Sequence, residues 1–225
     1  MARFETKTEE FTFEGAANLT ICSLRDRSQF DDDDGSAADA GVSDAMWPIF
    51  GLIWASGRIL AEHMCRTADD GARVLEIGCG LGMASLVMKR AGFDITASDI
   101  HPLARDFLNK NAELNGIAQI PFYLGDWATE APELGLFDRI IGSDVLYDRG
   151  HAPALSGFIA RHTKPDAEVI IVDANRGHTA SFRHHMDALD FSHVRAVAPT
   201  RDFGAGLYRG QIIVFRRGIS ASAAR

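Results

Sequence analysis

The chain has 225 residues, of which 46% are apolar and 24% are charged, and its formal net charge at pH 7 is -8. This length and composition suit one globular domain with a full core, and they exclude a disordered or fibrous chain. The negative charge repels nucleic-acid phosphates and weakly favours a cationic acceptor, so no nucleic-acid partner is expected.

Three further features predict a cytoplasmic protein. No apolar stretch approaches the roughly 18 residues that indicate a membrane span, so no membrane association is expected. The N-terminus leads into charged residues and not into the apolar segment of a signal peptide. Cys22, Cys65 and Cys79 are widely spaced and include no C-x-x-C pair, a usage typical of a reducing compartment.

The predicted elements alternate along the main part of the chain. Strands are predicted at 73–77, 93–98, 120–124, 138–143, 168–173, 193–198 and 207–215, and helices at 54–65, 83–91, 102–115, 151–163 and 178–190. This alternation predicts an α/β fold with a mostly parallel sheet and helices on both faces. No helix separates the last two strands, so the last strand is expected to run antiparallel.

Residues 1–45 are predicted to form an N-terminal extension. Apolar residues alternate in segments 11–13 and 19–21, with Gly15 between them, a pattern that predicts a β-hairpin. The run 31–34 consists of aspartates but lacks the ligand spacing of a calcium loop. We therefore interpret this run as a solvated acidic loop and assign no metal to it.

The main domain is predicted over residues 46–217, followed by a flexible tail at 218–225. Trp47 and Trp54 lie at its start, Trp54 at the first position of the predicted helix. Packing of both tryptophans between this helix and the sheet is one interpretation. Contact of a tryptophan with a ligand is the other.

The most informative segment reads Val-Leu-Glu-Ile-Gly-Cys-Gly-Leu-Gly at 74–82, between the first predicted strand and its helix. Glycines in this turn permit positive φ angles and let a ligand approach bare backbone. The free N–H groups at the helix start then face a polar or anionic group. The spacing differs from the G-x-G-x-x-G of dinucleotide-binding turns, and a turn without a ligand is the alternative.

Acidic side chains follow the next strands. Asp99 ends the second strand about 20 residues after the glycines, where a carboxylate can accept hydrogen bonds from both hydroxyls of a ribose. That position suits NAD as well as other nucleosides, and a helix cap is the alternative. Asp126 and Trp127 follow the third strand, where a turn with a half-buried tryptophan is the alternative.

Asp144 and Tyr147 follow the fourth predicted strand. Because the strand ends of an open parallel sheet line its ligand crevice, this carboxylate and phenol are expected to face the reacting group. A turn residue or helix cap is the alternative for Asp144. On a later helix, His178, His184 and His185 form no His-Glu-x-x-His pattern, so we interpret that helix as a surface helix and predict no metal site.

These motifs, in this order, resemble those of a known enzyme family. The glycine turn with Glu76 before it resembles motif I of the class I S-adenosylmethionine-dependent methyltransferases. The Asp-Val-Leu-Tyr run at 144–147 is similar to the D-x-x-Y pattern of the family-16, seven-β-strand lysine methyltransferases, once labelled nicotinamide N-methyltransferase-like. The resemblance implies a Rossmann-like, seven-stranded sheet of strand order 3-2-1-4-5-7-6, and S-adenosyl-L-methionine as cofactor.

The resemblance also implies a role for each motif. Glu76 and the glycine turn would hold the methionyl and ribose portions, while Asp126 and Trp127 would flank the adenine. Trp54 matches the family's cofactor tryptophan better than Trp47 does. The implied cofactor-binding residues are Trp54, Glu76, Gly78, Cys79, Gly80, Gly82, Asp99, Ile100, Asp126, Trp127 and Ser143, and the implied catalytic residues are Asp144 and Tyr147. Ser143 and the Trp47-Pro48 pair depart from many family members and leave the pocket shape open.

Three functions follow from these observations. The first is N-methylation of a lysine side chain of a protein substrate, with Asp144 holding the incoming cation and Tyr147 walling the lysine channel. The second is a small-molecule N-methyltransferase, for which a pocket enclosed over the cofactor would be the distinguishing feature. The third is a non-catalytic module that binds S-adenosylmethionine. An NAD-dependent oxidoreductase is a more distant alternative.

Overall fold

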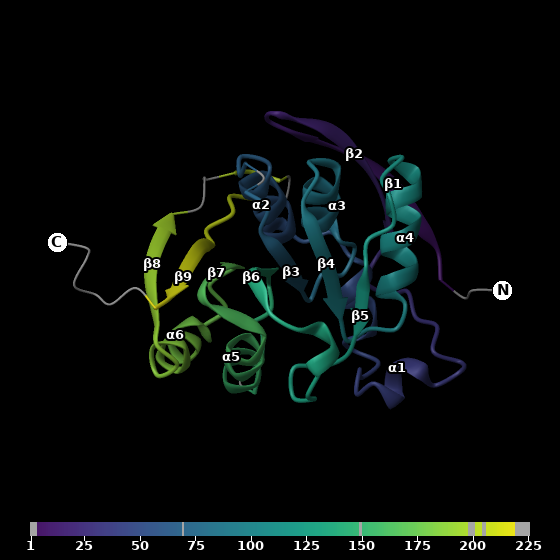
Figure 1. The fold of residues 1–225 in the computed structure, drawn as a ribbon. Coiled ribbons are helices and arrows are strands. Elements are labelled where there is room, and N and C mark those ends of the chain that lie inside the picture. The colour runs from purple at the N-terminus through teal and green to yellow at the C-terminus, as the bar shows by residue number, and fades with distance from the viewer. Residues whose placement is uncertain (1–3, 69, 149, 198–200, 204–205, 219–225) are drawn as a thin grey trace.

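The computed structural model describes residues 4–68, 70–148, 150–197, 201–203 and 206–218. Within them, seven strands form one sheet with helices packed around it (Figure 1). Its strands are β3 (Arg73–Ile77), β4 (Asp94–Asp99), β5 (Phe122–Leu124), β6 (Phe137–Ser143), β7 (Thr163–Asp173), β8 (Phe191–Val197) and β9 (Gln211–Arg217). The helices are α1 (Ser36–Asp39), α2 (Ala55–Met64), α3 (Met83–Arg90), α4 (Ala104–Leu114), α5 (His151–His162) and α6 (Thr179–Asp187), with 3-10 turns η1 (Trp47–Gly51) and η2 (Pro132–Leu134).

The strand order across the sheet is β5-β4-β3-β6-β7-β9-β8. Neighbouring strands are parallel except at β9, which runs antiparallel to both β7 and β8. The expected Rossmann-like order and the antiparallel last strand are therefore confirmed. Because the parallel strands share one direction, the side chains that follow β3, β4, β5 and β6 meet at one edge of the sheet.

Two apolar cores cover the two faces of the sheet. Along β3, Val74 belongs to one core and Leu75 to the other, the period of two expected of a strand buried on both faces. Helices α2, α3 and α4 contribute to the first core, for example through Leu108. Helices α5 and α6 contribute Phe158 and Phe182 to the second. The sheet is thus held between two helical layers, as the alternating sequence predicts.

The predicted N-terminal hairpin is confirmed, with strands longer than expected. Strand β1 (Thr6–Phe13) pairs antiparallel with β2 (Ala16–Leu24). The outer edge of β2 is covered by α4, where the side-chain amides of Asn111 and Asn115 both donate to and accept from its backbone at 2.7–3.2 Å. These two residues are four apart and share one helix face, so they act as a neighbouring strand would. The hairpin thereby anchors the chain that leads to the site.

The acidic run has a structural role that the sequence did not indicate. The Asp32 carboxylate accepts hydrogen bonds from the backbone N–H groups of Ala37 and Ala38 at 2.8 and 3.0 Å, and Asp34 accepts one from Ser36 at 3.0 Å. Carboxylates at a helix start satisfy N–H groups that have no partner within the helix. The run therefore holds the short helix α1, which was not predicted.

Two strand starts differ from the prediction by four residues or more, while the others differ by at most two. Strand β7 begins at Thr163 and not at 168, because Pro165 prevents α5 from continuing and the chain turns directly into extended backbone. Strand β9 begins at Gln211 and not at 207. There the Tyr208 ring folds over Gly210, where an added Cβ would lie 2.0 Å from the phenol oxygen. Residue 198 of the predicted sixth strand and residues 219–225 of the predicted tail lie outside the described residues.

Candidate active site

A cavity of about 630 Å³ opens at the carboxyl ends of β3, β4 and β6, and its size is typical of ligand sites. Its lining includes every predicted site residue except one: Trp54, Glu76, Gly78, Cys79, Gly80, Asp99, Ile100, Asp126, Trp127, Ser143, Asp144 and Tyr147. The exception is Gly82, which begins α3. Its φ of 71° lies in the left-handed region that favours glycine, and an added Cβ there would lie 2.2 Å from Leu108 Cδ1 of α4.

The glycine turn leaves the backbone bare at the floor of the cavity. Gly78 and Gly80 have φ angles of 58° and 52°, in the left-handed region that favours glycine. An added Cβ at Gly78 would lie 2.9 Å from Val145 Cγ1, and one at Gly80 would lie 2.7 Å from the Phe50 carbonyl oxygen. The backbone conformation and these neighbouring protein atoms therefore favour glycine at both positions, which leaves the backbone of the turn without side chains.

Two buried carboxylates flank this turn. One oxygen of Glu76 accepts hydrogen bonds from the backbone N–H of Ser85, at 2.8 Å, and from the Ser85 hydroxyl. Asp99 accepts one from the N–H of Gly80 at 2.8 Å and one from the N–H of His101 at 2.9 Å. Burial raises the pKa of Glu76 to about 7 and raises the pKa of Asp99. Both side chains are thus fixed by the backbone, with further oxygen lone pairs available to a ligand.

Asp126 and Trp127 close one side of the cavity after β5. Asp126 accepts hydrogen bonds from the N–H groups of Ala128 and Thr129 at 3.1 and 2.7 Å. Hydrogen bonds from Thr129 lower the pKa of Asp126, so it is a carboxylate at neutral pH. The Trp127 ring contacts His151 edge to face, with centroids 5.2 Å apart. Both are turn residues that also line the cavity, so the two interpretations of this motif are compatible.

Asp144 lies where β6 ends and has a left-handed φ of 52°, a strained conformation for a residue with a side chain. Its N–H donates to the Val172 carbonyl at 2.9 Å, and its side chain is 13% exposed. Burial raises the pKa of Asp144, while hydrogen bonding by Ser56 and the charge of Arg176 oppose this shift. Tyr147 lies nearer the mouth, where it is 38% exposed. A largely buried carboxylate and an accessible phenol ring thus share this part of the cavity.

Trp54 lies immediately before α2, and its indole N–H donates to the Ile49 carbonyl at 2.9 Å. Trp47, in contrast, is 1% exposed and packs among the rings of Phe4, Phe30 and Phe50, outside the lining. Ring packing therefore explains Trp47. Trp54 is the tryptophan of the pair that reaches the cavity.

Sequence reasoning missed several lining residues. The segment between the hairpin and α2 forms one wall, with Arg27, Met46 and Phe50 among its members. His101 stacks on Phe50 with centroids 3.8 Å apart, and burial lowers the pKa of this imidazole to about 4, so it is neutral at pH 7. Arg176, after β7, also lines the cavity. Its position just past a strand end was the available signal.

No group of three or more His, Cys, Asp or Glu side chains that could hold a metal ion occurs among the described residues. None of the helices in the described parts of the chain is long and apolar enough to cross a membrane. The bare glycine backbone, the Asp99 carboxylate with free lone pairs and the aromatic wall fit a nucleoside carrying a polar side chain. S-Adenosylmethionine is such a molecule.

Comparison with solved structures finds the same fold. Magnesium protoporphyrin IX methyltransferase from Synechocystis PCC 6803, solved with bound S-adenosylmethionine, aligns with a TM-score of 0.60 and 20% identity, over 86% of this chain and 100% of that one. A ribosomal protein L11 methylase from Lactobacillus delbrueckii subsp. bulgaricus aligns with a TM-score of 0.56 and 18% identity, over 72% of this chain and 78% of that one. At these identities the likeness establishes the fold.

Sequence comparison identifies the family. An electron transfer flavoprotein β subunit lysine methyltransferase from Xenopus laevis is 28% identical over 152 residues, 64% of this chain and 61% of the relative. A magnesium-protoporphyrin O-methyltransferase from Rhodobacter capsulatus is 38% identical over 92 residues, 38% of each chain. The chain thus spans less than two thirds of the length of these relatives. A family model described as lysine methyltransferase matches residues 43–190. The chain belongs to this lysine methyltransferase family, within the class I S-adenosylmethionine-dependent methyltransferases.

Proposed function

We propose that this protein transfers a methyl group from S-adenosylmethionine to the side-chain amine of a lysine in a protein substrate. The observation that carries the proposal is the largely buried carboxylate of Asp144 in a cavity whose charged lining is mainly acidic. The acidic lining residues are Glu76, Asp99, Asp126, Asp144 and Asp148, against Arg27 and Arg176. Such a lining favours a cationic acceptor over an anionic one.

The residues around the glycine turn are proposed to bind the cofactor, which when bound supplies an electrophilic methyl group on a sulfonium. Asp99 would accept hydrogen bonds from the ribose hydroxyls through the lone pairs that its two backbone donors leave free. Asp126 and Trp127 would flank the adenine. Gly78 and Gly80 would admit the cofactor against bare backbone. Each of these residues lines the cavity.

Asp144 and Tyr147 are proposed to bind and orient the acceptor. A lysine ammonium has a pKa of about 10.4 and must lose a proton before its nitrogen can act as a nucleophile. Asp144 would hold the ammonium on entry and orient the amine afterwards. The Tyr147 ring would form one wall of the lysine channel through a cation–π contact. A water can carry the proton away, so the main contribution of these residues is alignment of the amine.

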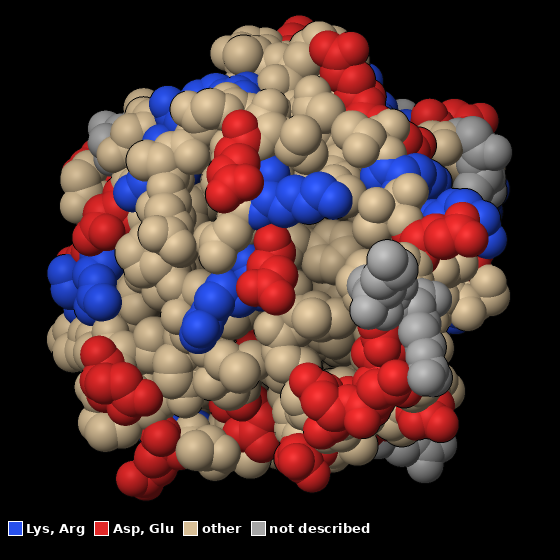
Figure 2. All heavy atoms as spheres, turned by 90° about the vertical axis from the view of Figure 1, so that its right-hand side faces the viewer, with Lys and Arg blue, Asp and Glu red and all other residues tan. Residues whose placement is uncertain are grey.

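The molecular surface supports a protein substrate that is locally basic. Figure 2 shows mainly acidic side chains over the lower part of one face, the level at which α1 lies in Figure 1. Asp33, Asp34, Asp39 and Asp44 are exposed in this region of the chain. A field of this sign attracts a positively charged segment. We also propose a cytoplasmic location, which the three unpaired cysteines favour.

A small-molecule N-methyltransferase is the second candidate function. The match to a relative named magnesium-protoporphyrin O-methyltransferase favours a small-molecule acceptor, although that name specifies oxygen and not nitrogen as the methylated atom. The half-exposed Tyr147 at the mouth argues against it, because an accessible ring suits a side chain entering from solvent. Binding of the cofactor without any transfer would indicate a third case, a non-catalytic binding module.

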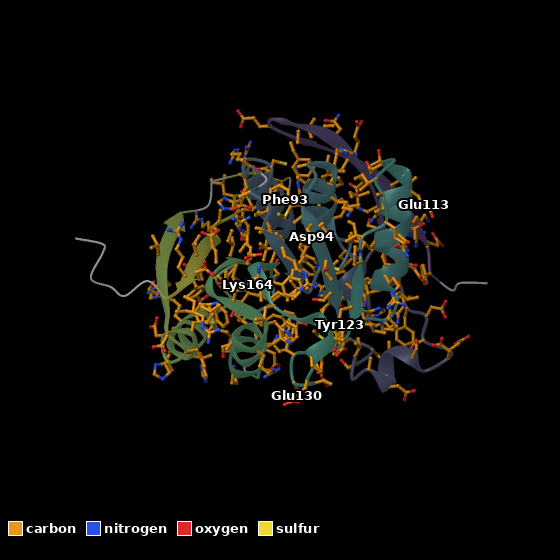
Figure 3. All side chains as sticks on the ribbon, viewed as in Figure 1. Phe93, Asp94, Glu113, Tyr123, Glu130 and Lys164 are labelled. Carbon is orange, nitrogen blue, oxygen red and sulfur yellow. The ribbon has the colours of Figure 1, made fainter. Side chains whose placement is uncertain are left out.

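The deciding experiment incubates the protein with methyl-labelled S-adenosylmethionine and an extract of cells that lack its gene. Asp144→Asn is the test variant. Glu130→Gln is the matched control, because Glu130 points away from the body of the protein at its lower edge (Figure 3). Label on a discrete protein band, lost only in Asp144→Asn, supports the proposal. Label confined to small molecules, or no label despite cofactor binding, contradicts it.

A further inference from the structure

A cation of the chain itself already lies beside the proposed acceptor carboxylate. Arg176 Nε is 3.6 Å from Asp144 Oδ1, and the Arg176 guanidinium carbon lies 5.5 Å from the centre of the Trp54 ring. All three side chains line the cavity together with Tyr147. A carboxylate with an aromatic ring beside it is a common arrangement for holding a cationic group. Here that arrangement holds Arg176.

The backbone of the Arg176 turn is fixed from both sides. Asn175 has a left-handed φ of 61°, its N–H donates to Asp173 at 3.0 Å, and its side-chain amide donates to the Arg209 carbonyl at 2.6 Å. Its side-chain oxygen accepts a hydrogen bond from Gln211 at 2.6 Å. The Arg176 side chain itself is 43% exposed. The guanidinium can therefore leave the cavity by changing rotamer, with no movement of the turn.

The contact between the two charges is incomplete. A close arginine–carboxylate pair is bidentate, with nitrogen–oxygen distances of roughly 2.7–2.9 Å. The observed separation is longer, and Asp144 Oδ1 is buried without a hydrogen-bond partner among the described residues. A second cation that bonds this oxygen directly would satisfy an atom that Arg176 leaves unsatisfied. Exchange of one cation for another also spares Asp144 the cost of being buried unpaired.

We propose that Arg176 is a specificity-determining residue: it occupies the acceptor subsite as an internal cation, and a primary alkylammonium group displaces it. The inference deepens the proposed lysine methylation and rests on it for the identity of the natural acceptor. The alternative is that Arg176 is a receptor for the carboxylate of a small acceptor. Asp144 and Asp148 line the cavity together with Arg176, and the charge of Asp173 acts on Asp144, so an anion would meet more negative than positive charge.

The test measures binding of two probes of similar shape, n-butylammonium and n-butyrate, by ligand-observed NMR at constant ionic strength. The 225-residue chain is saturated with S-adenosylhomocysteine, which lacks the sulfonium charge. If Arg176 leaves the subsite in about a tenth of the molecules, Arg176→Ala should bind butylammonium about tenfold more tightly than the wild type. The double variant Arg176→Ala/Asp144→Asn should lose this gain.

Three controls make the result specific. Arg105→Ala removes the same charge from α4, outside the cavity, and should bind both probes as the wild type does. Arg176→Lys keeps a cation and should bind butylammonium less tightly than Arg176→Ala does. Arg176→Met keeps the apolar stem over Trp54 and replaces the alanine variant if that variant is unstable. Equal gains in the lysine and alanine variants would show that charge is not what blocks the subsite, and would overturn the proposal.

Two other outcomes would also overturn it: no gain for butylammonium in Arg176→Ala, or butyrate binding to the wild type that Arg176→Ala abolishes. The second would make Arg176 an anion receptor. Because the measurement is of binding, it is independent of methyl transfer. If butylammonium binding changes as expected but no protein in the extract is methylated, this inference is supported and only the proposed lysine methylation is contradicted.

Discussion

The two ends of the cavity hold their carboxylates in different ways. At the Asp99 end, formed by Glu76, Asp99 and the glycine turn, both carboxylates accept hydrogen bonds from backbone N–H groups at 2.8–2.9 Å. At the Asp144 end, formed by Asp144, Tyr147 and Arg176, the carboxylate has a strained backbone, a distant ion-pair partner and one unsatisfied oxygen.

The difference corresponds to two kinds of ligand. A rigid, preorganised site suits a cofactor that is the same in every turnover, because the protein then needs little ordering when the cofactor binds. An acceptor that enters, reacts and leaves is better met by a group whose partner can be replaced. We therefore expect substitutions at the Asp99 end to alter cofactor binding and stability, and substitutions at the Asp144 end to alter transfer.

The largest effect is expected at the Asp144 end. Asp144→Asn should lower methyl transfer by about 100-fold or more, because the acceptor amine loses the group that aligns it. Cofactor affinity should stay within about twofold, since the change lies away from the Asp99 end. Turnover and binding of S-adenosylhomocysteine measured on the same preparation check this, with Glu130→Gln as control. If methyl transfer and cofactor affinity fell together, the two ends of the cavity would not act separately.

The second prediction concerns stability and pH at the Asp99 end. Burial raises the pKa of Glu76 to about 7 in the folded protein, above its ordinary value of 4.5. Between these two pH values the folded state binds a proton that the unfolded state has released, so this group makes stability fall as pH rises. Glu76→Gln removes the titration. Its free energy of unfolding relative to wild type should therefore rise by about 2 kcal/mol between pH 5 and pH 7.

Urea unfolding at both pH values measures this difference. Glu113→Gln is the matched control, because Glu113 is exposed on α4 and changes no buried charge (Figure 3). If the difference in unfolding free energy between Glu76→Gln and wild type were the same at both pH values, burial would not raise the pKa of Glu76 toward 7. The Asp99 end would then be more accessible to water than its hydrogen bonds indicate.

The third prediction separates ligand contact from turn formation at Asp99. Asp99→Asn removes a charged acceptor from a proposed ribose contact, and hydrogen bonds to charged groups are stronger than neutral ones. Binding of S-adenosylhomocysteine, measured by calorimetry, should weaken by about tenfold. Asp94→Asn, at the exposed start of the same strand, should leave it unchanged (Figure 3). If Asp99→Asn bound S-adenosylhomocysteine as tightly as wild type, Asp99 would serve only to form the turn.

The contrast also shows what can be predicted from a sequence. Glu76, Asp99 and Asp144 were predictable because each stands at the end of an apolar run, and parallel strand ends meet at one edge. Their hydrogen-bond partners were harder to predict from the sequence. The Asp144 strain and its unsatisfied oxygen depend on how β6 sits beside β7. The sheet order was implied by family resemblance, since alternation of elements alone predicts only a parallel sheet.

The lining residues that the sequence analysis missed are placed by contacts between segments far apart in the chain. Arg176 reaches the cavity because Asn175 is tied to Arg209 and Gln211, residues that follow it by more than 30 positions and belong to the β9 region. The position of Arg176 just past a strand end places it near that edge of the sheet, but no local pattern shows that these distant residues hold its turn. The wall around Phe50 depends on where the hairpin directs the chain, and Gly82 serves packing against Leu108 although its spacing matches the glycine motif. Motifs located the site, and tertiary contacts decide which motif residues face it.

A small effect is expected at Tyr147, and it would show which part of this side chain acts at the Asp144 end. A cation–π contact depends on the ring and not on the hydroxyl, so Tyr147→Phe should behave as wild type. Tyr147→Ala should raise the acceptor KM by about fivefold with kcat nearly unchanged, the effect of losing roughly 1 kcal/mol of binding. Steady-state kinetics on a lysine acceptor check both. If Tyr147→Phe instead lowered kcat, the phenol O–H would be acting on the amine, and the Asp144 end would contain two orienting groups in place of one.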